Sequence, residues 1–247
     1  MSLKDKTIKG VKWTTFGSLF NAVLQIVQLA ILARILSPSD FGLMAIVMVI
    51  IGFSNMFIDM GISNAIIYKQ KVSENQLTSL YWLNVFVGLC LFLIVLIISP
   101  FVAGFYETPE LTKLIVLVGT TFLIQPFGQQ FMILLQKELQ FDKITKVQIS
   151  ARFCSFIAIV LFAIFDFGVL SLAYGVITYS IISTLLFIYN GVEIYKPNLN
   201  FRRQDLKEFL NFGLYQMGEK AINYFSTQFD TILIGKLLGI EVLGVYN

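Results

Sequence analysis

Seven long apolar runs constrain the fold of this chain more than any other feature does. Their cores cover residues 13–33, 41–62, 80–105, 114–135, 149–165, 169–189 and 212–234. Most are close to the roughly 20 residues with which an α-helix crosses the hydrocarbon core of a bilayer. We therefore predict an all-α fold, a polytopic transmembrane helical bundle. The run at 149–165 is short and is the weakest of the seven.

The composition supports a membrane protein. The 247 residues are 57% hydrophobic and 13% charged, with a mean hydropathy of +0.79. Soluble domains carry about 25% charged residues, so this chain has too few charges to cover a surface that faces water. The first apolar run is too long for a signal peptide and is followed by no small-residue cleavage site. We expect it to remain as a membrane span.

The basic residues between the runs are unevenly distributed. Thirteen lysines and arginines lie before the first run or in the loops that follow the second, fourth and sixth runs. The opposite side carries only three, Arg34, Lys113 and Lys236. Because cytoplasmic loops are enriched in Lys and Arg, we predict a multi-pass protein with a cytoplasmic N-terminus.

The first run is repeated in the seventh. A shift of 202 positions places Arg34 on Lys236 and Gly42 on Gly244. The same shift aligns two sets of polar residues, which are Thr14, Ser18, Asn21, Gln25 and Gln28 with Gln216, Lys220, Asn223, Thr227 and Asp230. Each set steps by four and three residues in turn, so it forms one stripe along a helix. Chance matching of two apolar segments is the competing explanation, but it does not account for the polar positions.

The repeat predicts a two-lobed architecture. Six spans separate the two copies, so both cross the membrane in the same direction and the repeat is parallel. We predict an N-terminal six-span lobe over residues 1–194, a cytoplasmic linker over 195–209 and the first span of an incomplete second lobe over 210–247. The two polar stripes are expected to face a shared central cavity.

Polar and charged residues inside the spans are the candidate functional residues, because such groups are costly in lipid and usually face a partner or a wet cavity. The candidates for a substrate cavity are Asn21, Gln25, Gln28, Gln125, Gln129, Arg152, Gln216, Lys220 and Asn223. The candidates for ion coupling are Glu219, Asp230 and Asp59. Several have a structural alternative. Asp59 and Arg152 can reach the membrane surface, and the glutamines beside Pro126 and Gly128 can bond neighbouring helices across a simple kink.

Several kinds of chemistry have no support in the sequence. The chain has no histidine and no P-loop or dinucleotide fingerprint, so we predict no metal, no cofactor and no enzymatic activity. Cys90 and Cys154 lie in separate runs and are expected to be small core residues. The basic loops follow from membrane topology and anionic lipids, so no nucleic-acid partner is expected.

Short motifs along the whole chain resemble those of Wzx-type polysaccharide flippases. They are LSPSDFGL (36–43), FIDMGIS (57–63) with AII (65–67), YWLN (81–84), LQKELQF (135–141), FGV (167–169) and DTILIGKLLG (230–239) with LGVY (243–246). The order and spacing of the motifs carry the resemblance, since none of them is specific alone. The chain is similar to the lipopolysaccharide and colanic-acid exporter branch of the multidrug/oligosaccharidyl-lipid/polysaccharide exporter superfamily.

The resemblance implies two six-helix lobes around a central cavity. It also implies alternating access for a polyprenyl-pyrophosphate-linked oligosaccharide in the bacterial inner membrane, where the partners are the lipid-linked glycan, membrane lipids and, as a candidate, polysaccharide polymerase machinery. The chain departs from this pattern because it stops just inside the second lobe, so we expect it to be part of a longer protein.

Three alternatives stay open at this point. A cation-coupled multidrug exporter of the same superfamily could use Glu219, Asp230 and Tyr224. A membrane glycosyltransferase or ligase would need a large outer loop, and the outer loops here are short. A membrane scaffold would not explain the polar stripe.

Overall fold

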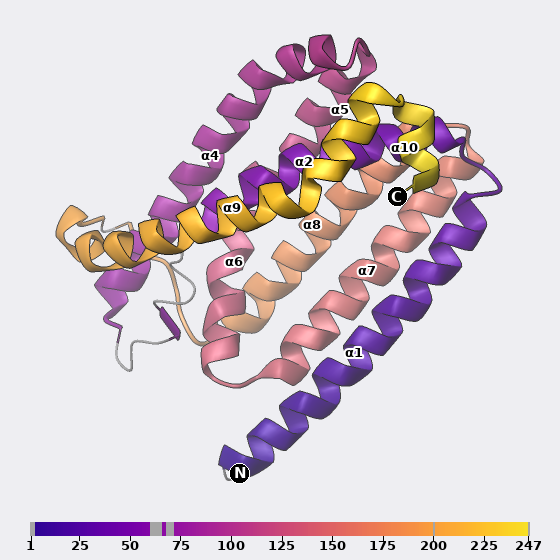
Figure 1. Ribbon diagram of the computed structural model, residues 1–247. Coiled ribbons are helices and arrows are strands. Elements are labelled where there is room, and N and C mark those ends of the chain that lie inside the picture. Colours follow the sequence, from indigo (N-terminus) through magenta and orange to yellow (C-terminus); the bar gives the residue numbers. More distant parts are fainter. Residues whose placement is uncertain (1–2, 60–65, 68–71, 200, 247) are drawn as a thin grey trace.

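The structure is a computed structural model that describes residues 3–59, 66–67, 72–199 and 201–246. The regular elements of these residues are helices (Figure 1). In chain order they are α1 (Leu3–Leu32), α2 (Pro38–Asp59), α4 (Glu74–Phe105), α5 (Glu110–Gly119), α6 (Thr121–Lys137), α7 (Phe141–Ile164), α8 (Val169–Gly191), the 3₁₀ turn η1 (Arg203–Leu206), α9 (Lys207–Leu237) and α10 (Ile240–Tyr246).

The predicted polytopic helical bundle is confirmed. Six segments within the described residues are helical, long and apolar enough to cross a membrane, and they match the first six predicted spans. They are Thr7–Leu32, Pro38–Ile58, Glu74–Phe105, Glu110–Lys137, Phe141–Ile164 and Val169–Gly191. The seventh predicted span lies within α9.

Side-chain caps fix where two of the helices begin. At α4 the Ser73 hydroxyl accepts a hydrogen bond from the Gln76 backbone, and the Gln76 side chain accepts one from the Ser73 backbone. At α2 the Asp40 carboxylate accepts hydrogen bonds from the backbone N–H and the hydroxyl of Ser37. Such caps satisfy backbone groups that a helix leaves without intrahelical partners.

The fourth span is interrupted at Thr120, where α5 ends and α6 begins. Pro126 and Gly128 lie inside α6, and the kink expected there stays a prediction. The hydroxyls of Thr120 and Thr121 donate to the carbonyls of Leu117 and Val118, at 2.6 and 2.7 Å. Threonine hydroxyls that bond to the preceding turn bend helices, which explains a break at this position.

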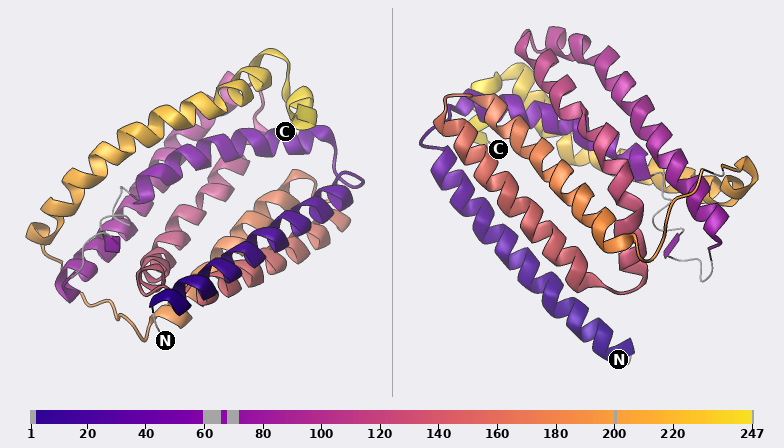
Figure 2. Two further views of the ribbon diagram at one scale, coloured as in Figure 1. Left: turned by 60° about the horizontal axis from the view of Figure 1, so that its bottom comes forward. Right: turned by 180° about the vertical axis from the view of Figure 1, so that it is seen from behind.

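The helices form two packed groups. In one, α7 packs between α1 and α8, and α6 packs on the other side of α8 (Figures 1 and 2). In the other, α9 lies along α2 and continues into α10, which packs against the start of α2. Small residues allow the close approach of α1 and α7, since a Cβ on Gly10 would lie 2.8 Å from the Phe141 ring.

Two buried apolar clusters lie at opposite ends of the bundle. The first cluster includes Val47, Leu114, Phe122 and Ala163. The second cluster includes Leu80, Phe131, Val147 and Phe187. Helices α6, α7 and α8 each contribute to both clusters. The middle of each helix therefore lies between the clusters, and this is where the polar side chains described below are found.

The segment that leads into α9 is held against the start of α4. The Tyr195 hydroxyl donates to Thr78 at 2.8 Å, the Trp82 indole donates to the Asn198 carbonyl at 2.8 Å, and the Arg202 backbone donates to Ser79 at 3.0 Å. Burial raises the pKa of Tyr195, which keeps its hydroxyl protonated. The division into lobes and a linker remains a prediction.

One core assignment is wrong. Cys90 is half-buried, but Cys154 is exposed, together with Phe153, Ile157 and Leu161 on α7. In a helix that crosses the membrane, an exposed apolar face is satisfied by lipid. The apolar pattern alone therefore could not distinguish a core position from a lipid-facing one.

Candidate functional site

A polar pocket, here called the amide pocket, lies between α2, α6, α7 and α8. Its volume is about 270 Å³. Its lining combines amides and hydroxyls with a few apolar side chains, and comprises Asn55, Ile58, Gln125, Gly128, Gln129, Met132, Gln148, Tyr179, Ser183, Thr184 and Phe187. On α6, α7 and α8 it falls between the two apolar clusters.

The spacing of residues along α6 determines which of its side chains line the amide pocket. Gln125 and Gln129 are four residues apart, so they lie on one face of the helix, and both are half-buried. Gly128 lets α6 approach α8 closely, because a Cβ there would lie 2.8 Å from the Thr184 Cα. The neighbouring Gln130 points elsewhere. It is fully buried, and its side-chain amide donates to the Leu77 carbonyl of α4 at 2.8 Å.

A cation lies next to the pocket. The guanidinium of Arg152 lies 5.1 Å from the ring centroid of Tyr179, which lines the pocket. Arg152 is also one helical turn beyond Gln148, another lining residue. The guanidinium is exposed, and it offers five N–H donors in a planar fork that suits phosphate oxygens. The stacking on Tyr179 holds it beside the amides.

This arrangement suits a polar ligand with an anionic group. Glutamine and asparagine amides both donate and accept hydrogen bonds, as sugar hydroxyls do. Charge-assisted bonds from arginine are strong and directional for phosphates. The described lining contains no carboxylate.

The structure therefore brings together three of the predicted cavity residues, Gln125, Gln129 and Arg152. It adds three that the sequence analysis did not select, Asn55, Gln148 and Tyr179. Asn55 lies within a predicted span, so the rule that polar residues inside spans are informative could have found it. Gln148 precedes the predicted run 149–165 and lies inside the longer observed helix α7, so the rule could not have found it. Tyr179 carries no such signal, since tyrosines are common in apolar helices.

The polar stripe of α1 does not line the amide pocket. Gln25 and Gln28 line a second pocket of about 600 Å³ between α1, α2, α8 and α10. Asn21 is half-buried, and its Oδ1 atom is buried with no hydrogen-bond partner among the described residues. Thr14 donates to the Gly10 carbonyl of its own helix at 3.0 Å.

Helix α9 packs against α2 and α10, but the described residues of its polar stripe are mostly exposed. Asn223 is exposed and Lys220 is half-buried. The Thr227 hydroxyl donates to carbonyls of its own helix, and the Asp230 carboxylate accepts a hydrogen bond from the Tyr246 hydroxyl at 2.8 Å. Three predicted candidates, the side chains of Gln216, Glu219 and Asp59, lie outside the described residues. The described parts of the two stripes do not line a common pocket.

Comparison with known proteins gives a consistent set of relatives. The family described as "Polysaccharide biosynthesis protein" matches residues 31–247. The lipopolysaccharide biosynthesis protein WzxC of Escherichia coli is 37% identical over the whole chain, which covers 50% of WzxC. The teichuronic acid biosynthesis protein TuaB of Bacillus subtilis is 34% identical, again over the whole chain and 51% of TuaB. The succinoglycan biosynthesis transport protein ExoT of Rhizobium meliloti is 25% identical over the whole chain and 50% of ExoT.

The chain thus spans about half the length of the curated relatives that it matches. No solved structure matches it.

Proposed function

The chain belongs to the family of polysaccharide biosynthesis proteins, and on this premise we propose that the complete protein exports a lipid-linked oligosaccharide across the bacterial cytoplasmic membrane. The cargo is a polyprenyl-pyrophosphate-linked precursor of a lipopolysaccharide, O-antigen or exopolysaccharide. The protein moves this cargo by alternating access and is a transporter rather than an enzyme. Because the chain spans half of its relatives, the second half of the cavity comes from a second lobe.

The amide pocket is the observation that carries this proposal. Its amides offer donors and acceptors to sugar hydroxyls, and Arg152 beside it offers a fork of donors to a pyrophosphate. These groups lie in the middle of a bundle whose ends are apolar clusters. Polar side chains inside membrane spans usually face a partner or a wet cavity.

The contact between α2 and α10 supports alternating access. Gly42 of α2 packs against the Ile240 carbonyl of α10, and Gly244 of α10 packs against the Pro38 carbonyl of α2. The two helices thus touch through backbone atoms at one end of the bundle. We propose that this end faces outside and is closed in this conformation, so the cavity opens towards the cytoplasm. Separation of α2 from α10 would then open the outer side.

The orientation follows from the thirteen basic residues at the other end of the spans. Those residues include Lys9 and Lys143, which lie beside the turn between α6 and α7. The positive-inside rule places that end in the cytoplasm. Arg34 and Lys236 then lie on the outer side, and the N-terminus is cytoplasmic.

Ion coupling is a further part of the proposal. Glu219, Asp230 and Asp59 are the candidate carboxylates, since acids within membrane spans often take part in ion pathways. Asp230 is engaged with Tyr246 in the described structure. A cation-coupled multidrug exporter is the alternative function, but the amide pocket favours it less, because its described lining holds no acid and its Tyr179 ring is already stacked with Arg152.

The proposal is tested by complementation. The full-length gene is expressed in a bacterial strain that lacks its own copy, and surface polysaccharide is measured together with the lipid-linked intermediate on each side of the membrane. We expect the wild type to restore surface polysaccharide. We expect the Arg152→Ala variant to accumulate the intermediate on the cytoplasmic side. Unchanged surface polysaccharide in this variant, at normal protein levels, would contradict the role of the amide pocket.

A further inference from the structure

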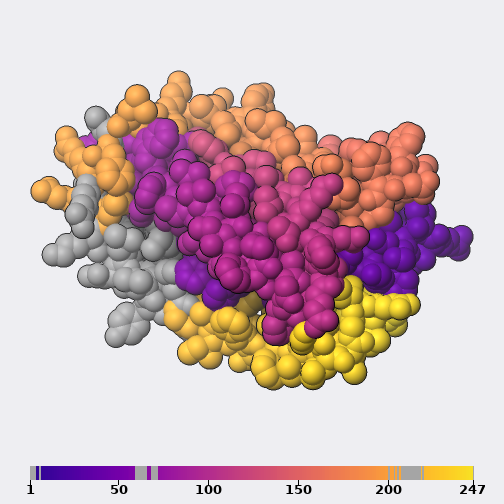
Figure 3. All heavy atoms as spheres, turned by 90° about the horizontal axis from the view of Figure 1, so that it is seen from above, coloured from indigo at the N-terminus to yellow at the C-terminus, as the bar shows by residue number. Residues whose placement is uncertain are grey.

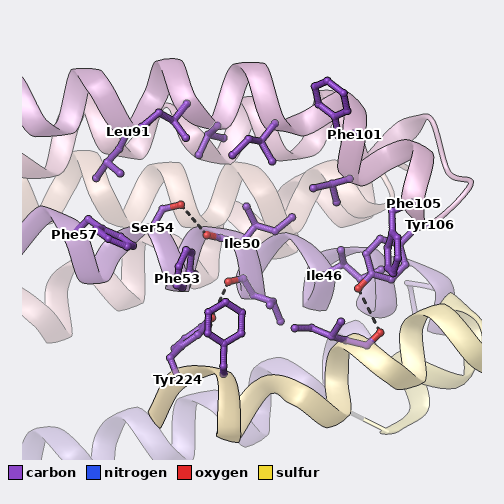
Figure 4. A pocket seen from close by; sticks show the side chains of 17 residues that line it. Ile46, Ile50, Phe53, Ser54, Phe57, Leu91, Phe101, Phe105, Tyr106 and Tyr224 are labelled. Atoms are coloured by element: carbon purple, nitrogen blue, oxygen red, sulfur yellow. Dashed lines mark hydrogen bonds between the residues drawn. The ribbon is translucent and has the colours of Figure 1, made fainter. Parts of the chain in front are cut away.

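A third, mainly apolar pocket lies on the other face of α2. It has a volume of about 580 Å³ and is enclosed by α2, α4 and α9 (Figure 4). Ser54 and Phe57 of α2 face this pocket, whereas Asn55 and Ile58 face the amide pocket. Helix α2 therefore separates the two pockets.

The polar side chains of this apolar pocket already have partners. The Ser54 hydroxyl donates to the Ile50 carbonyl at 2.9 Å, and the Tyr224 hydroxyl donates to the Val49 carbonyl at 2.8 Å. The Tyr106 hydroxyl donates to the Ile232 carbonyl at 3.4 Å, and Figure 4 shows this bond at the end of the pocket near Phe105. The described lining leaves no other polar side chain for a ligand. A ligand in this space would be a hydrocarbon.

The pocket opens on the exposed face of α4. Ile94, Ile98 and Phe101 line it, and these side chains are 47%, 44% and 74% exposed. On the face seen in Figure 3, α4 and α9 border each other, with part of α2 between them. A volume of this size falls in the usual range for small-molecule sites. A chain from the surrounding lipid can therefore enter without crossing the core of the lobe.

A cation marks one end of the pocket. Lys236 donates to the carbonyl of Phe105, a lining residue, at 2.7 Å, and its Nζ lies 5.2 Å from the centroid of the Phe105 ring. The same Nζ pairs with Glu107 at 3.1 Å, but the Glu107 side chain is 82% exposed. Exposed ion pairs contribute little, so a phosphate can take the place of Glu107 and keep a charge-assisted bond to Lys236.

We propose that this pocket binds one acyl chain of an anionic phospholipid, whose phosphate is held by Lys236. The lipid-linked sugar carrier fits less well, because the described rim offers one lysine rather than a pyrophosphate clamp, and the lining offers no donors for sugars. The acyl chain would fill the space between α4 and α9. It would thereby stabilise α9 on the first six spans. This site does not depend on the proposed transport function.

Lipid binding to the purified full-length protein tests the proposal. Phosphatidylglycerol and phosphatidylcholine with the same acyl chains are titrated separately, and bound lipid is counted by native mass spectrometry. Ile94→Trp places a large side chain in the pocket. Ile97→Trp is the matched control, because Ile97 lies on the same helix, is 62% exposed and does not line the pocket. We expect Ile94→Trp to lower phosphatidylglycerol binding several-fold and Ile97→Trp to leave it unchanged.

Lys236 variants test binding of the lipid headgroup separately from binding of the acyl chain. We expect Lys236→Ala to remove the preference for phosphatidylglycerol over phosphatidylcholine, and Lys236→Arg to retain it. Lys236 is exposed, so these variants should fold even if a tryptophan in the pocket does not. Equal binding by Ile94→Trp and Ile97→Trp, or an unchanged lipid preference in Lys236→Ala, would overturn the proposal. Displacement of phosphatidylglycerol by an equal amount of polyprenyl phosphate would also overturn it, since the site would then take the carrier.

Discussion

Gly42 and Gly244 occupy reciprocal positions in the contact between α2 and α10. The two glycines are 202 positions apart, and each packs against the backbone carbonyl of the residue four positions before the other, Ile240 or Pro38. Pro38 and Ile240 are themselves 202 positions apart and are the first residues of α2 and α10. The sequence repeat thus corresponds to a local two-fold relationship between helices.

The first prediction concerns this contact. A Cβ on Gly42 would meet the Ile240 carbonyl, which is backbone and cannot rotate away. We expect Gly42→Ala to destabilise the full-length protein by about 1–3 kcal/mol, the usual cost of overpacking, in thermal unfolding. Gly104→Ala is the control, since a Cβ at Gly104 meets nothing within 4 Å. An alanine helps a helix by about 0.5–1 kcal/mol relative to glycine, so similar gains in both variants would contradict a tight contact.

The second prediction contrasts two adjacent amides. Gln129 lines the amide pocket, whereas Gln130 is buried and bonds the Leu77 carbonyl. We expect Gln129→Ala to reduce export with little change in thermal stability. We expect Gln130→Ala to lower stability by about 1–3 kcal/mol, because it removes a buried hydrogen bond. Export assays and thermal unfolding of both variants provide the measurement. A stability loss confined to Gln129→Ala would reverse the assignment.

The third prediction separates charge from geometry at Arg152. Its guanidinium stacks on Tyr179 beside the amide pocket. We expect Arg152→Lys to retain part of the export activity, because it keeps the charge and loses the planar fork. We expect Tyr179→Phe to retain more activity than Tyr179→Leu, since a phenyl ring still supports a cation–π contact. Surface polysaccharide at matched protein levels is the readout. Equal activity of the Phe and Leu variants would show that the stacking has no role.

The fourth prediction is topological. With Cys90 and Cys154 replaced by serine, single cysteines are placed at Glu107 and Leu199, whose side chains are both largely exposed. A membrane-impermeant thiol reagent applied to intact cells should label the cysteine at 107 and spare the one at 199. This follows from the distribution of basic residues. The opposite labelling pattern would invert the proposed orientation.

The fifth prediction concerns Lys220, the one lysine of the two polar stripes. We expect Lys220→Gln to impair export without loss of protein from the membrane, because it would remove a charge that holds the pyrophosphate. The competing role is an ion pair with the adjacent Glu219. Recovery of surface polysaccharide in the double variant Glu219→Gln with Lys220→Gln would favour the ion pair and contradict a role in substrate binding.

The sequence by itself determined the membrane class, the positions of six spans and the family. Apolar runs of about 20 residues can be located from composition alone, because the bilayer fixes their length. The caps at Ser37 and Ser73 could also be predicted, since each is formed by residues three positions apart. The repeat between α1 and α9 was visible because equivalent polar residues recur at one helical spacing.

Only the tertiary structure decided which polar residues meet. Gln125, Gln148 and Tyr179 come from three helices, and their convergence depends on how α6, α7 and α8 pack through small residues such as Gly128. The opposite orientations of Gln129 and Gln130 follow from helix rotation, which the apolar pattern does not fix when lipid and core are both apolar. For the same reason, the exposure of Cys154 and the apolar pocket between α2, α4 and α9 could not be predicted from the sequence. Both depend on contacts between distant segments.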